Sequence, residues 1–291
     1  MFIIEKLSFK NLKYLEMLQQ EANNKYMNDK DFFELYNKKS FISKYRKRRE
    51  IKLFKYENEY IGYLWIQYPL TEVIKINSLY INEKHIDWLS NELFHIFKGK
   101  TLSFDVVDSK LTYDIMNKLN FKTIKSTSLM KMQISKCKFK FNKNVNFKIF
   151  TKKQDENLRC FIQNSVFQDN ERVPLVPYDI KQEEQEDYYI NDLCVFIMLG
   201  NVAIGYGQVI AKKDFYTIVN VGILEEYRKK GYGEMLIKYL IYLCSKRHIS
   251  CIAINVEVEN YKAMNLYKKI GFEEYRRVTT WENKLYSNLK S

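Results

Sequence analysis

Hydrophobic and polar positions change their spacing several times in the last third of the chain. Residues 214–224, DFYTIVNVGIL, are apolar and β-branched and predict a buried strand, in which Gly222 marks a bulge or a close backbone approach. From Glu234 the apolar residues recur at helical spacing. This helix is expected to end near residues 246–248, KRH, because a helix C-terminus favours cations.

Two more elements follow that helix. Residues 249–258, ISCIAINVEV, form the nearly continuous apolar run of a parallel strand covered on both faces, which predicts a right-handed βαβ unit. Residues 259–272 predict a short helix with Asn260 as N-cap and Gly271 just past its end, and Phe272 returns the chain to a strand. The apolar stripe of this helix is Ala263, Leu266, Tyr267 and Ile270.

The same patterns occur earlier, which indicates an internal repeat. IGYLWIQY (61–68) begins like IGYGQVIA (204–211), and NSLYI (77–81) lies over NVGIL (220–224) at the same offset, 204 − 61 = 143. Residues 106–121 lie over 257–272, now at an offset of 257 − 106 = 151. A repeat of this size predicts two similar domains, which we place at residues 1–143 and 144–291.

The two copies differ where the offset changes. The first copy lacks eight residues, 151 − 143, and has INEKHIDWLSNELF (81–94), without glycine, where the second has YRKKGYGE (227–234). The first copy also carries Ser109 opposite Asn260, Met116 opposite Tyr267 and Asn120 opposite Gly271. We therefore expect the function of the glycine turn only in the C-terminal copy.

The glycine turn joins a strand directly to a helix. Unpaired N–H groups at such a helix start attract anions, and glycines let the backbone approach them. Arg228, Lys229 and Lys230 add positive charge, which fits a diphosphate. The turn lacks the GK[ST] ending of a P-loop and the third glycine of a dinucleotide fingerprint. A turn that is merely tightened by its glycines is the alternative.

Composition narrows the class of protein. The chain has 291 residues, room for two ordinary domains or one large one, and 46% apolar content, enough for sizeable cores. Its apolar runs are too short for a bilayer. Its first ten residues interrupt any signal-peptide pattern with charges. Five scattered cysteines, at 137, 160, 194, 244 and 251, predict reduced core residues and neither a disulfide framework nor a metal site. We expect a cytoplasmic protein.

Charge leaves alternatives open. The net charge of +13 attracts polyanions of any kind. Its densest basic run, KYRKRREIK (44–52), is either a solvated loop or strand edge or a polyanion-binding patch, and we do not expect nucleic acid as the partner. Residues 167–189 either attract a cationic amine or form a solvated helix face. Their carboxylates are Glu171, Asp179, Glu183, Glu184, Glu186 and Asp187.

The two motifs of the C-terminal copy, taken together, resemble the GNAT N-acetyltransferase superfamily. Its pattern is a strand, R-x-x-G-x-G, a helix, a second strand and N-x-x-A-x-x-L-Y-x-x-x-G-F. The matching residues are Arg228, Gly231, Gly233, Asn260, Ala263, Leu266, Tyr267, Gly271 and Phe272. The resemblance implies an α/β fold of two tandem domains, each a twisted mixed, mainly antiparallel sheet flanked by helices around a central βαβ unit.

The resemblance also implies a cofactor, acetyl-CoA, and an acyl transfer to a primary amine of a small molecule or peptide. Backbone N–H groups of the turn would hold the pyrophosphate, and the strand at residues 221–223 would pair with the pantetheine arm, with one N–H stabilising the oxyanion. The cofactor-binding set is Val221, Gly222, Ile223, Arg228, Lys229, Lys230, Gly231, Tyr232, Gly233, Glu234, Asn260, Ala263 and Tyr267.

The catalytic roles follow from the same resemblance. Tyr267 is expected to act as general acid toward the leaving thiolate. Some family members place a glutamate base at the position of Asn255, so Glu257, two residues on and on the same strand face, takes the role here or is an ordinary polar residue. The alternative function is a non-catalytic module that senses acetyl-CoA, with a basic N-terminal half that binds a polyanion.

Overall fold

The computed structural model describes residues 2–26, 31–68, 72–89, 91–135, 139, 144–168, 173–212 and 215–285. Cys137 and Glu171, singled out above, lie outside these ranges. The chain divides into two compact units. Unit 1 comprises Met1–Thr127 and Arg276–Ser291, and unit 2 comprises Ser128–Tyr275.

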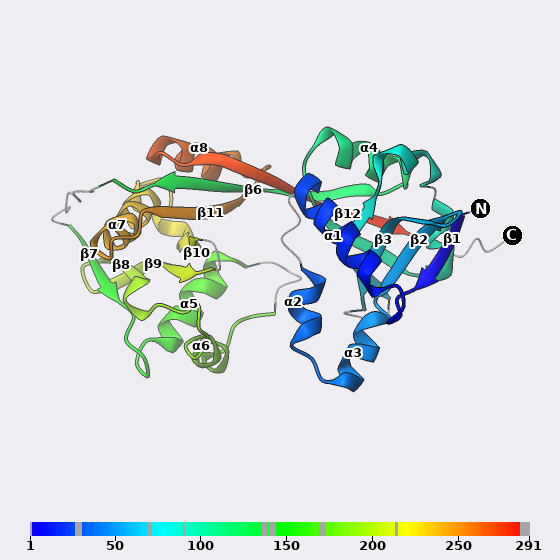
Figure 1. The fold of residues 1–291 in the computed structure, drawn as a ribbon. Coiled ribbons are helices and arrows are strands. Elements are labelled where there is room, and N and C mark those ends of the chain that lie inside the picture. Colours follow the sequence, from blue (N-terminus) through cyan, green and yellow to red (C-terminus); the bar gives the residue numbers. More distant parts are fainter. Residues whose placement is uncertain are drawn as a thin grey trace, which may run out of the picture. The chain divides into compact units, whose positions relative to one another are not determined.

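Unit 1 is built on a mixed sheet in the order β1-β2-β3-β4-β5-β12 (Figure 1). Its strands are antiparallel except for the parallel pair β4–β5. They are β1 (Phe2–Lys6), β2 (Ile51–Tyr56), β3 (Glu59–Gln67), β4 (Val73–Ile81), β5 (Thr101–Val107) and most of β12 (Glu273–Lys284). The helices are α1 (Leu12–Tyr26), α2 (Phe32–Asn37), α3 (Phe41–Arg48), the 3₁₀ helices η1 (Glu83–Trp88) and η2 (Asn91–Phe97), and α4 (Lys110–Lys118).

The sheet of unit 1 is covered on both faces. Leu15 and Leu18 of α1 pack with Tyr63 and Trp65 of β3 in one cluster. Leu64 and Ile66, the alternate residues of the same strand, pack in a second cluster with side chains of η2 and α4. Because successive residues of a strand point to opposite faces, the two clusters lie on opposite sides of the sheet.

Unit 2 repeats this architecture with the strand order β6-β11-β10-β9-β8-β7. Its parallel pair, β10–β11, again lies inside the sheet. The strands are β7 (Val145–Ile149), β8 (Cys194–Leu199), β9 (Val202–Ala211), β10 (Tyr216–Ile223), β11 (Cys251–Glu257) and the second half of β6 (Lys122–Gln133). The helices are α5 (Glu156–Val166), α6 (Pro177–Glu183), η3 (Asn191–Leu193), η4 (Glu225–Tyr227), α7 (Tyr232–Lys246) and α8 (Tyr261–Ile270).

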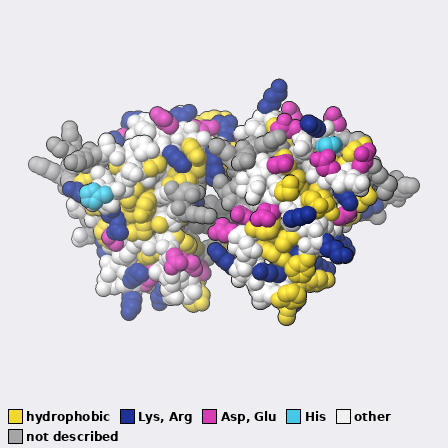
Figure 2. Space-filling view, in the orientation of Figure 1, with side chains coloured by type: hydrophobic (Ala, Val, Ile, Leu, Met, Phe, Trp, Pro, Cys, Tyr) yellow, Lys and Arg dark blue, Asp and Glu magenta, His cyan; other side chains and the backbone are white. Residues whose placement is uncertain are grey.

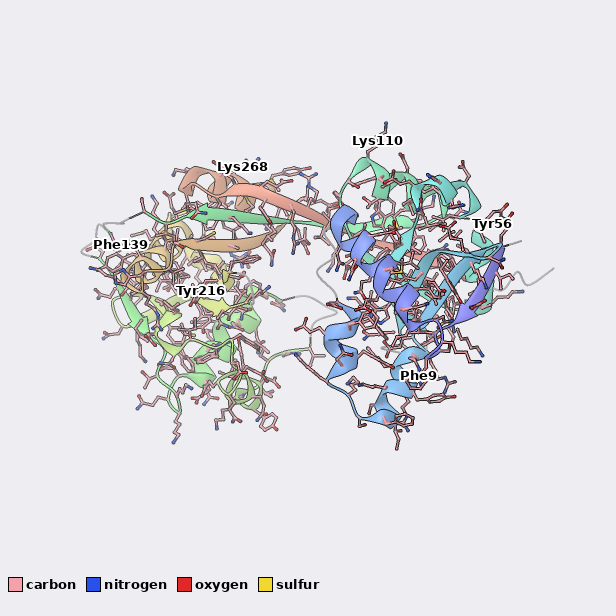
Figure 3. The ribbon with its side chains drawn as sticks, in the orientation of Figure 1. Phe9, Tyr56, Lys110, Phe139, Tyr216 and Lys268 are labelled. Carbon is pink, nitrogen blue, oxygen red and sulfur yellow. The ribbon has the colours of Figure 1, made fainter. Side chains whose placement is uncertain are left out.

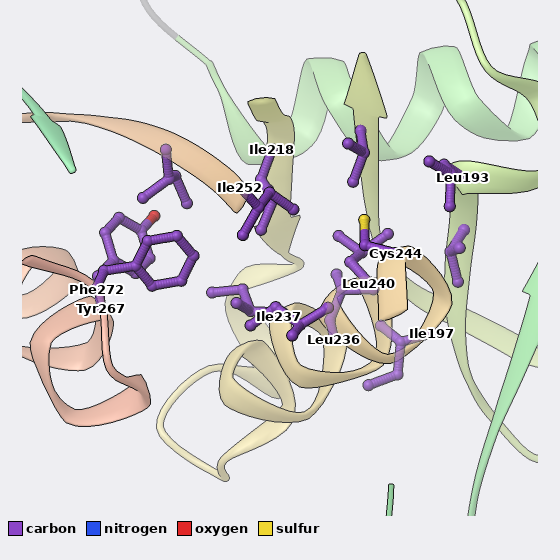
Figure 4. Close-up of a cluster of buried hydrophobic side chains, with 14 of the residues drawn as sticks. Leu193, Ile197, Ile218, Leu236, Ile237, Leu240, Cys244, Ile252, Tyr267 and Phe272 are labelled. Carbon is purple, nitrogen blue, oxygen red and sulfur yellow. The ribbon is translucent and has the colours of Figure 1, made fainter. Parts of the chain in front are cut away.

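Helices cover both faces of this second sheet as well. Val195 and Ile197 of β8 pack in a cluster with the apolar face of α7 and with Tyr267 of α8, which Figure 4 shows from within. Cys194 and Phe196 of the same strand pack in a different cluster, with side chains of α5 and α6. The alternation along β8 places α7 and α8 on one face and α5 and α6 on the other.

The predicted α/β architecture is confirmed in both units, and so is the βαβ unit, β10-α7-β11, with its parallel strands. Two details differ. The helix begins at Tyr232 and not at Glu234, because Gly231 already provides the N-cap conformation. In the first copy the helix between the parallel strands is replaced by η1 and η2.

The compact units are divided differently from the predicted domains. Contacts assign residues 128–143 to unit 2 and residues 276–291 to unit 1. The reason is β12, the last strand of the second repeat, which pairs with β5 from Val278 opposite Val107 to Lys284 opposite Thr101. The domains 1–143 and 144–291 stay a prediction about the sequence repeat.

Other expectations concern single residue types. Cys160, Cys194 and Cys244 are free and buried, and Cys251 is free and half-buried, as predicted for core cysteines. Within the described ranges, no helix is both long and apolar enough to span a membrane. The described residues also include no group of three or more His, Cys, Asp or Glu side chains placed to hold a metal ion.

Candidate functional site

Strand β10 carries a bulge near its end. Its register with β9 passes from Val219 opposite Gln208 to Gly222 opposite Tyr206, so Asn220 and Val221 together face a single residue. Asn220 adopts a positive φ of 55° there. The parallel register with β11 ends at Ile218, which leaves the backbone of residues 219–223 without a ladder partner on that side among the described residues. Exposed strand backbone of this kind can pair with an extended ligand.

Gly222 owes its place to packing within the protein. A Cβ at this position would lie 2.1 Å from Val166 Cγ1 of α5. The predicted bulge is confirmed, and α5 is the element that requires glycine there. Val221 is half-buried and Ile223 is buried.

The turn after β10 has two residues in the left-handed region. Lys229 has φ 61° and Gly231 has φ 82°. Gly231 is the N-cap of α7 and provides no side-chain cap. The first backbone hydrogen bond at this helix start is donated by Met235 N to the Gly231 carbonyl, at 3.1 Å. Among the described residues, the backbone N–H groups of residues 232–234 therefore have no hydrogen-bond partner. A helix start of this kind can bind an anion.

Among the described residues, none would clash with a side chain added at either glycine of the turn. A Cβ at Gly231 would meet no atom within 4 Å, and one at Gly233 would meet only Ile223 Cγ1, at an ordinary 3.7 Å. Gly231 is needed for its positive φ, but packing gives no reason for Gly233. Packing therefore does not explain why position 233 lacks a side chain. A glycine there would let a ligand such as the pyrophosphate of acetyl-CoA approach the backbone closely.

The cations of the turn differ in their roles. Arg228 folds back and braces the end of β10, since its Nε donates to the Ile223 carbonyl at 2.9 Å and its Nη2 to the Val166 carbonyl at 3.4 Å. Lys229 is exposed, and Lys230 Nζ donates to the Glu226 carbonyl at 3.2 Å. Arg228 therefore fixes the loop, while the two lysines contribute mainly long-range charge.

Glu234 turns toward lysines and not toward the loop. Its Oε1 accepts from Lys238 Nζ and its Oε2 from Lys269 Nζ, both at 2.7 Å. These hydrogen bonds hold the pKa of Glu234 below its ordinary value. The contact ties the first turn of α7 to the end of α8 and neutralises a carboxylate that would otherwise repel an anion at the helix start.

Tyr267 lies on the buried face of α8. Its side chain is 8% exposed and packs beside Phe272, with ring centroids 6.1 Å apart. Figure 4 shows its hydroxyl directed away from α8. The hydroxyl has no hydrogen-bond partner in the described part of the chain, and burial raises the pKa of Tyr267 to about 12. The phenol is thus protonated at neutral pH and has a free O–H to donate.

The other residues of the second motif have mainly structural contacts. Asn260 caps α8, because its Oδ1 accepts from Ala263 N at 3.1 Å, as predicted. Gly271 ends the helix with φ 116°. Asn255 and Glu257 are exposed on either side of buried Val256, so they share one face of β11. The role of Glu257 as a base stays a prediction.

The acidic segment is less free than its composition indicated. Asp179 accepts from Val176 N at 2.9 Å and caps α6. Glu183 forms an ion pair with Arg159, whose side chain is fully buried, and also accepts from Gln208 Nε2 at 2.6 Å. Burial, and next the charge of Glu156, raise the pKa of Glu184. Glu186 and Asp187 are exposed, and these two remain the candidates for attracting a cationic amine.

Sequence reasoning missed Val166 and Arg159. Val166 decides the residue at position 222 and receives a bond from Arg228, and no sequence signal marks it. Arg159 has a signal, because it falls on the apolar side of α5, where a cation needs a buried partner. Its Nε and Nη1 have no hydrogen-bond partner among the described residues.

Comparison with known proteins finds one matching protein family in this part of the chain. Residues 157–272 match the model of the Acetyltransferase (GNAT) family. This matched region contains the bulged strand, the glycine turn and α8, so the likeness to the GNAT family lies where the sequence motifs stand.

One curated relative is the ribosomal protein bS18-alanine N-acetyltransferase of Haemophilus influenzae, which is 27% identical over 111 residues, 38% of this chain and 73% of that protein. Of other curated relatives it matches, the chain spans less than half the length, such as 46% of one from Bacillus subtilis and 36% of one from Xenopus laevis.

Two solved structures share the fold of most or all of the chain. A GCN5-related N-acetyltransferase from Sphaerobacter thermophilus has a TM-score of 0.67 and 14% identity, covering 100% of this chain and 98% of that one. A tandem GNAT protein from the clavulanic acid biosynthesis pathway has a TM-score of 0.56 and 10% identity, covering 81% and 82%. At such identities the likeness concerns the fold alone, and it extends to the N-terminal repeat.

Proposed function

We propose that the protein is an N-acetyltransferase that moves an acetyl group from acetyl-CoA to a primary amine, using the site in its C-terminal repeat. The observation that carries the proposal is the uncapped start of α7, directly after a bulged strand. At Gly233 in this helix start, packing within the protein does not require a glycine. The family match of residues 157–272 supports it.

The chain's own residues divide the work of binding. Backbone N–H groups of residues 232–234 would hold the pyrophosphate, with Lys229 and Lys230 adding charge around them. The backbone at Val221 and Ile223 would pair with the pantetheine arm, because its β11 side is open. When bound, acetyl-CoA supplies an acetyl group already activated as a thioester.

Proton transfer would be handled by two side chains. Tyr267 keeps its proton at Oη well above neutral pH and can donate it toward a leaving group. Glu257, exposed on β11, would accept the amine proton directly or through water. An amine attacking directly needs no nucleophilic cysteine.

The acceptor is best sought among peptides. The matched curated relative from Haemophilus influenzae is named for acetylating an alanine of ribosomal protein bS18. A peptide that begins with alanine is therefore the first acceptor to test, and small primary amines are the second. Exposed Glu186 and Asp187 would favour a protonated amine in either class.

The test is thiol release from acetyl-CoA over a panel of alanine-starting peptides and small amines. Tyr267→Phe should lower kcat by a factor of about 10² to 10⁴, the usual contribution of a general acid, with unchanged affinity for acetyl-CoA. Tyr261→Phe, on the exposed face of the same helix, is the matched control and should keep full activity.

Two results would contradict the proposal. Turnover that survives Tyr267→Phe unchanged would remove Tyr267 as the acid. Tight binding of acetyl-CoA without turnover on any amine would instead favour the alternative, a module that senses acetyl-CoA without catalysis.

A further inference from the structure

Unit 1 contains a pocket of about 860 Å³ that the proposed acetyl transfer does not use. It lies where the end of β1, α3 and the start of β2 meet. Its walls are mostly cationic. The basic residues that line it are Lys6, Arg46, Arg48, Arg49 and Lys52.

Two of these cations oppose each other directly. Lys6 and Lys52 are partners in the antiparallel register of β1 with β2. Like charges at such a position destabilise a sheet. Burial, followed by the charges of Lys6 and Arg49, lowers the pKa of Lys52, so this site disfavours the charged form of Lys52 when no anion is bound. An anion between them would remove this cost.

The pocket has little negative charge of its own. Among the described residues, Glu50 is the one acidic residue that lines it. Oε2 of Glu50 already accepts from Lys47 Nζ at 2.7 Å and from Trp65 Nε1 at 2.9 Å. Within the described ranges, none of the five lining cations forms an ion pair with a carboxylate. Their charge is therefore available to a ligand.

Arg48 is held in place before any ligand arrives. It is 6% exposed, its Nη1 donates to Tyr36 Oη at 2.8 Å, and its guanidinium lies 3.8 Å from the centre of the Phe9 ring. Figure 3 labels Phe9 close to the end of unit 1 that contains α3. A guanidinium fixed in this way loses little freedom when it binds an oxyanion.

Aromatic side chains border the cations. Tyr45 and Tyr68 line the pocket and are 59% and 60% exposed. Figure 2 shows Lys and Arg side chains beside hydrophobic ones over this part of unit 1. Exposed tyrosine rings can stack on a planar base, and the volume lies in the range of small-ligand pockets.

We propose that this pocket binds a small nucleotide-like phosphate ester, with its phosphates on the cationic wall and its base against Tyr45 or Tyr68. The basic run of residues 44–52 is not one solvated loop. Residues 44–48 end α3, where Lys47 and Arg48 are buried, a turn follows, and β2 begins at Ile51. The proposal stands independently of acetyl transfer.

Calorimetric titration of the full chain at fixed low salt tests it, with ADP, AMP, inorganic pyrophosphate and adenosine as probes. ADP should bind with one saturable site and adenosine should not. Arg49→Gln should weaken ADP by about tenfold, the effect of losing one charged hydrogen bond. Lys110→Gln removes the same charge from exposed α4 of unit 1 (Figure 3) and should change the ADP affinity by less than about twofold.

Further arms separate this pocket from the glycine turn and from nucleic acid. ADP binding should be unchanged in Gly233→Ala, and acetyl-CoA turnover should be unchanged in Arg49→Gln. The proposal is overturned if ADP does not bind, if adenosine binds equally well, or if Gly233→Ala and not Arg49→Gln abolishes ADP binding. Affinity for single-stranded RNA that grows steadily with length, with no saturation by ADP, would also overturn it in favour of a nucleic-acid surface.

Discussion

The two repeats keep the same backbone irregularity while differing in their chemistry. In β10 the bulge contains Asn220, and in β4 the register with β3 skips Asn77, which is 143 positions earlier and lies at the matching place. In both repeats the bulged strand is also the one with a parallel neighbour. The bulge therefore belongs to the fold and is not by itself a sign of cofactor binding.

Helices α4 and α8, which follow the second parallel strand of each repeat, also begin and end in the same way. Ser109 caps α4 with its side chain as Asn260 caps α8. Asn120 adopts φ 57° at the place where Gly271 has φ 116°. Both positions need the left-handed conformation, which asparagine tolerates and glycine favours.

The connection between the parallel strands is where the repeats diverge. Unit 2 has a glycine start and a 15-residue α-helix, whereas unit 1 has two 3₁₀ helices that bury Leu89, Leu93 and Phe94. Met116 is buried where Tyr267 stands in the second repeat. The comparison teaches that caps, bulge and core specify the fold, while an open helix start and one hydroxyl distinguish the candidate site from the matching place in the first repeat.

The largest predicted effect tests whether Gly222 serves the fold. Gly222→Ala would place a methyl 2.1 Å from Val166 Cγ1 and should lower the free energy of unfolding by about 3 kcal/mol, the cost of overpacking. Denaturant unfolding measures the loss. Val166→Ala in the same chain should restore part of it, and an unaffected single variant would show that Gly222 is not a packing glycine.

Gly233→Ala tests the opposite assignment. A Cβ there has room in the protein, so stability should be kept or rise by up to about 1 kcal/mol from helix propensity. Affinity for acetyl-CoA should fall about tenfold, because a methyl blocks close backbone approach. Thermal unfolding and titration together check this, and equal affinity in both proteins would remove Gly233 from the site.

A matched pair of substitutions compares the helix ends of the two repeats. Gly271→Ala should cost about 1 kcal/mol of stability, since φ 116° strains a residue with a Cβ. Asn120→Gly should change stability by less than about 0.5 kcal/mol, because asparagine already tolerates that region. Equal losses measured by chemical unfolding would contradict the shared role.

The smallest effect concerns the contact of Glu234 with Lys238 and Lys269. The pKa of Glu234 is lowered in the folded state, so its contribution is present above the unfolded value and is lost as pH falls through the folded one. Glu234→Gln should therefore cost about 0.5 kcal/mol near pH 7, because the lysines are exposed, and less at a pH below the ordinary glutamate value of about 4.3. Unfolding curves at both pH values measure the difference.

The element boundaries of unit 2 could mostly be predicted from the sequence, because the strand, cap and glycine patterns there indicate the same boundaries. The β-branched run of β10, the glycines before α7, the cap at Asn260 and the glycine at 271 each indicate the same boundaries as the structure within a few residues. Helix caps and bulges depend on neighbours in sequence, so their residues carry the information themselves.

What the sequence could not show depends on distant partners. Val166 against Gly222, Arg159 against Glu183 and the assignment of β12 to the first sheet all join segments far apart in the chain. The basic run of residues 44–52 was also ambiguous, because charges on a helix that is partly buried look like those of a solvated loop. Pairings of this kind are decided by packing, which one sequence does not record.

The place of β12 has a consequence for how the protein is made. Val107 pairs with Val278, which is synthesised 278 − 107 = 171 residues later. The edge of the unit 1 sheet at β5 therefore stays unpaired until almost all the described chain has been synthesised. An unpaired edge of that kind invites strands from other molecules during translation. Truncation before β12 should accordingly leave an aggregation-prone nascent product, although every helix of unit 1 would already have been translated.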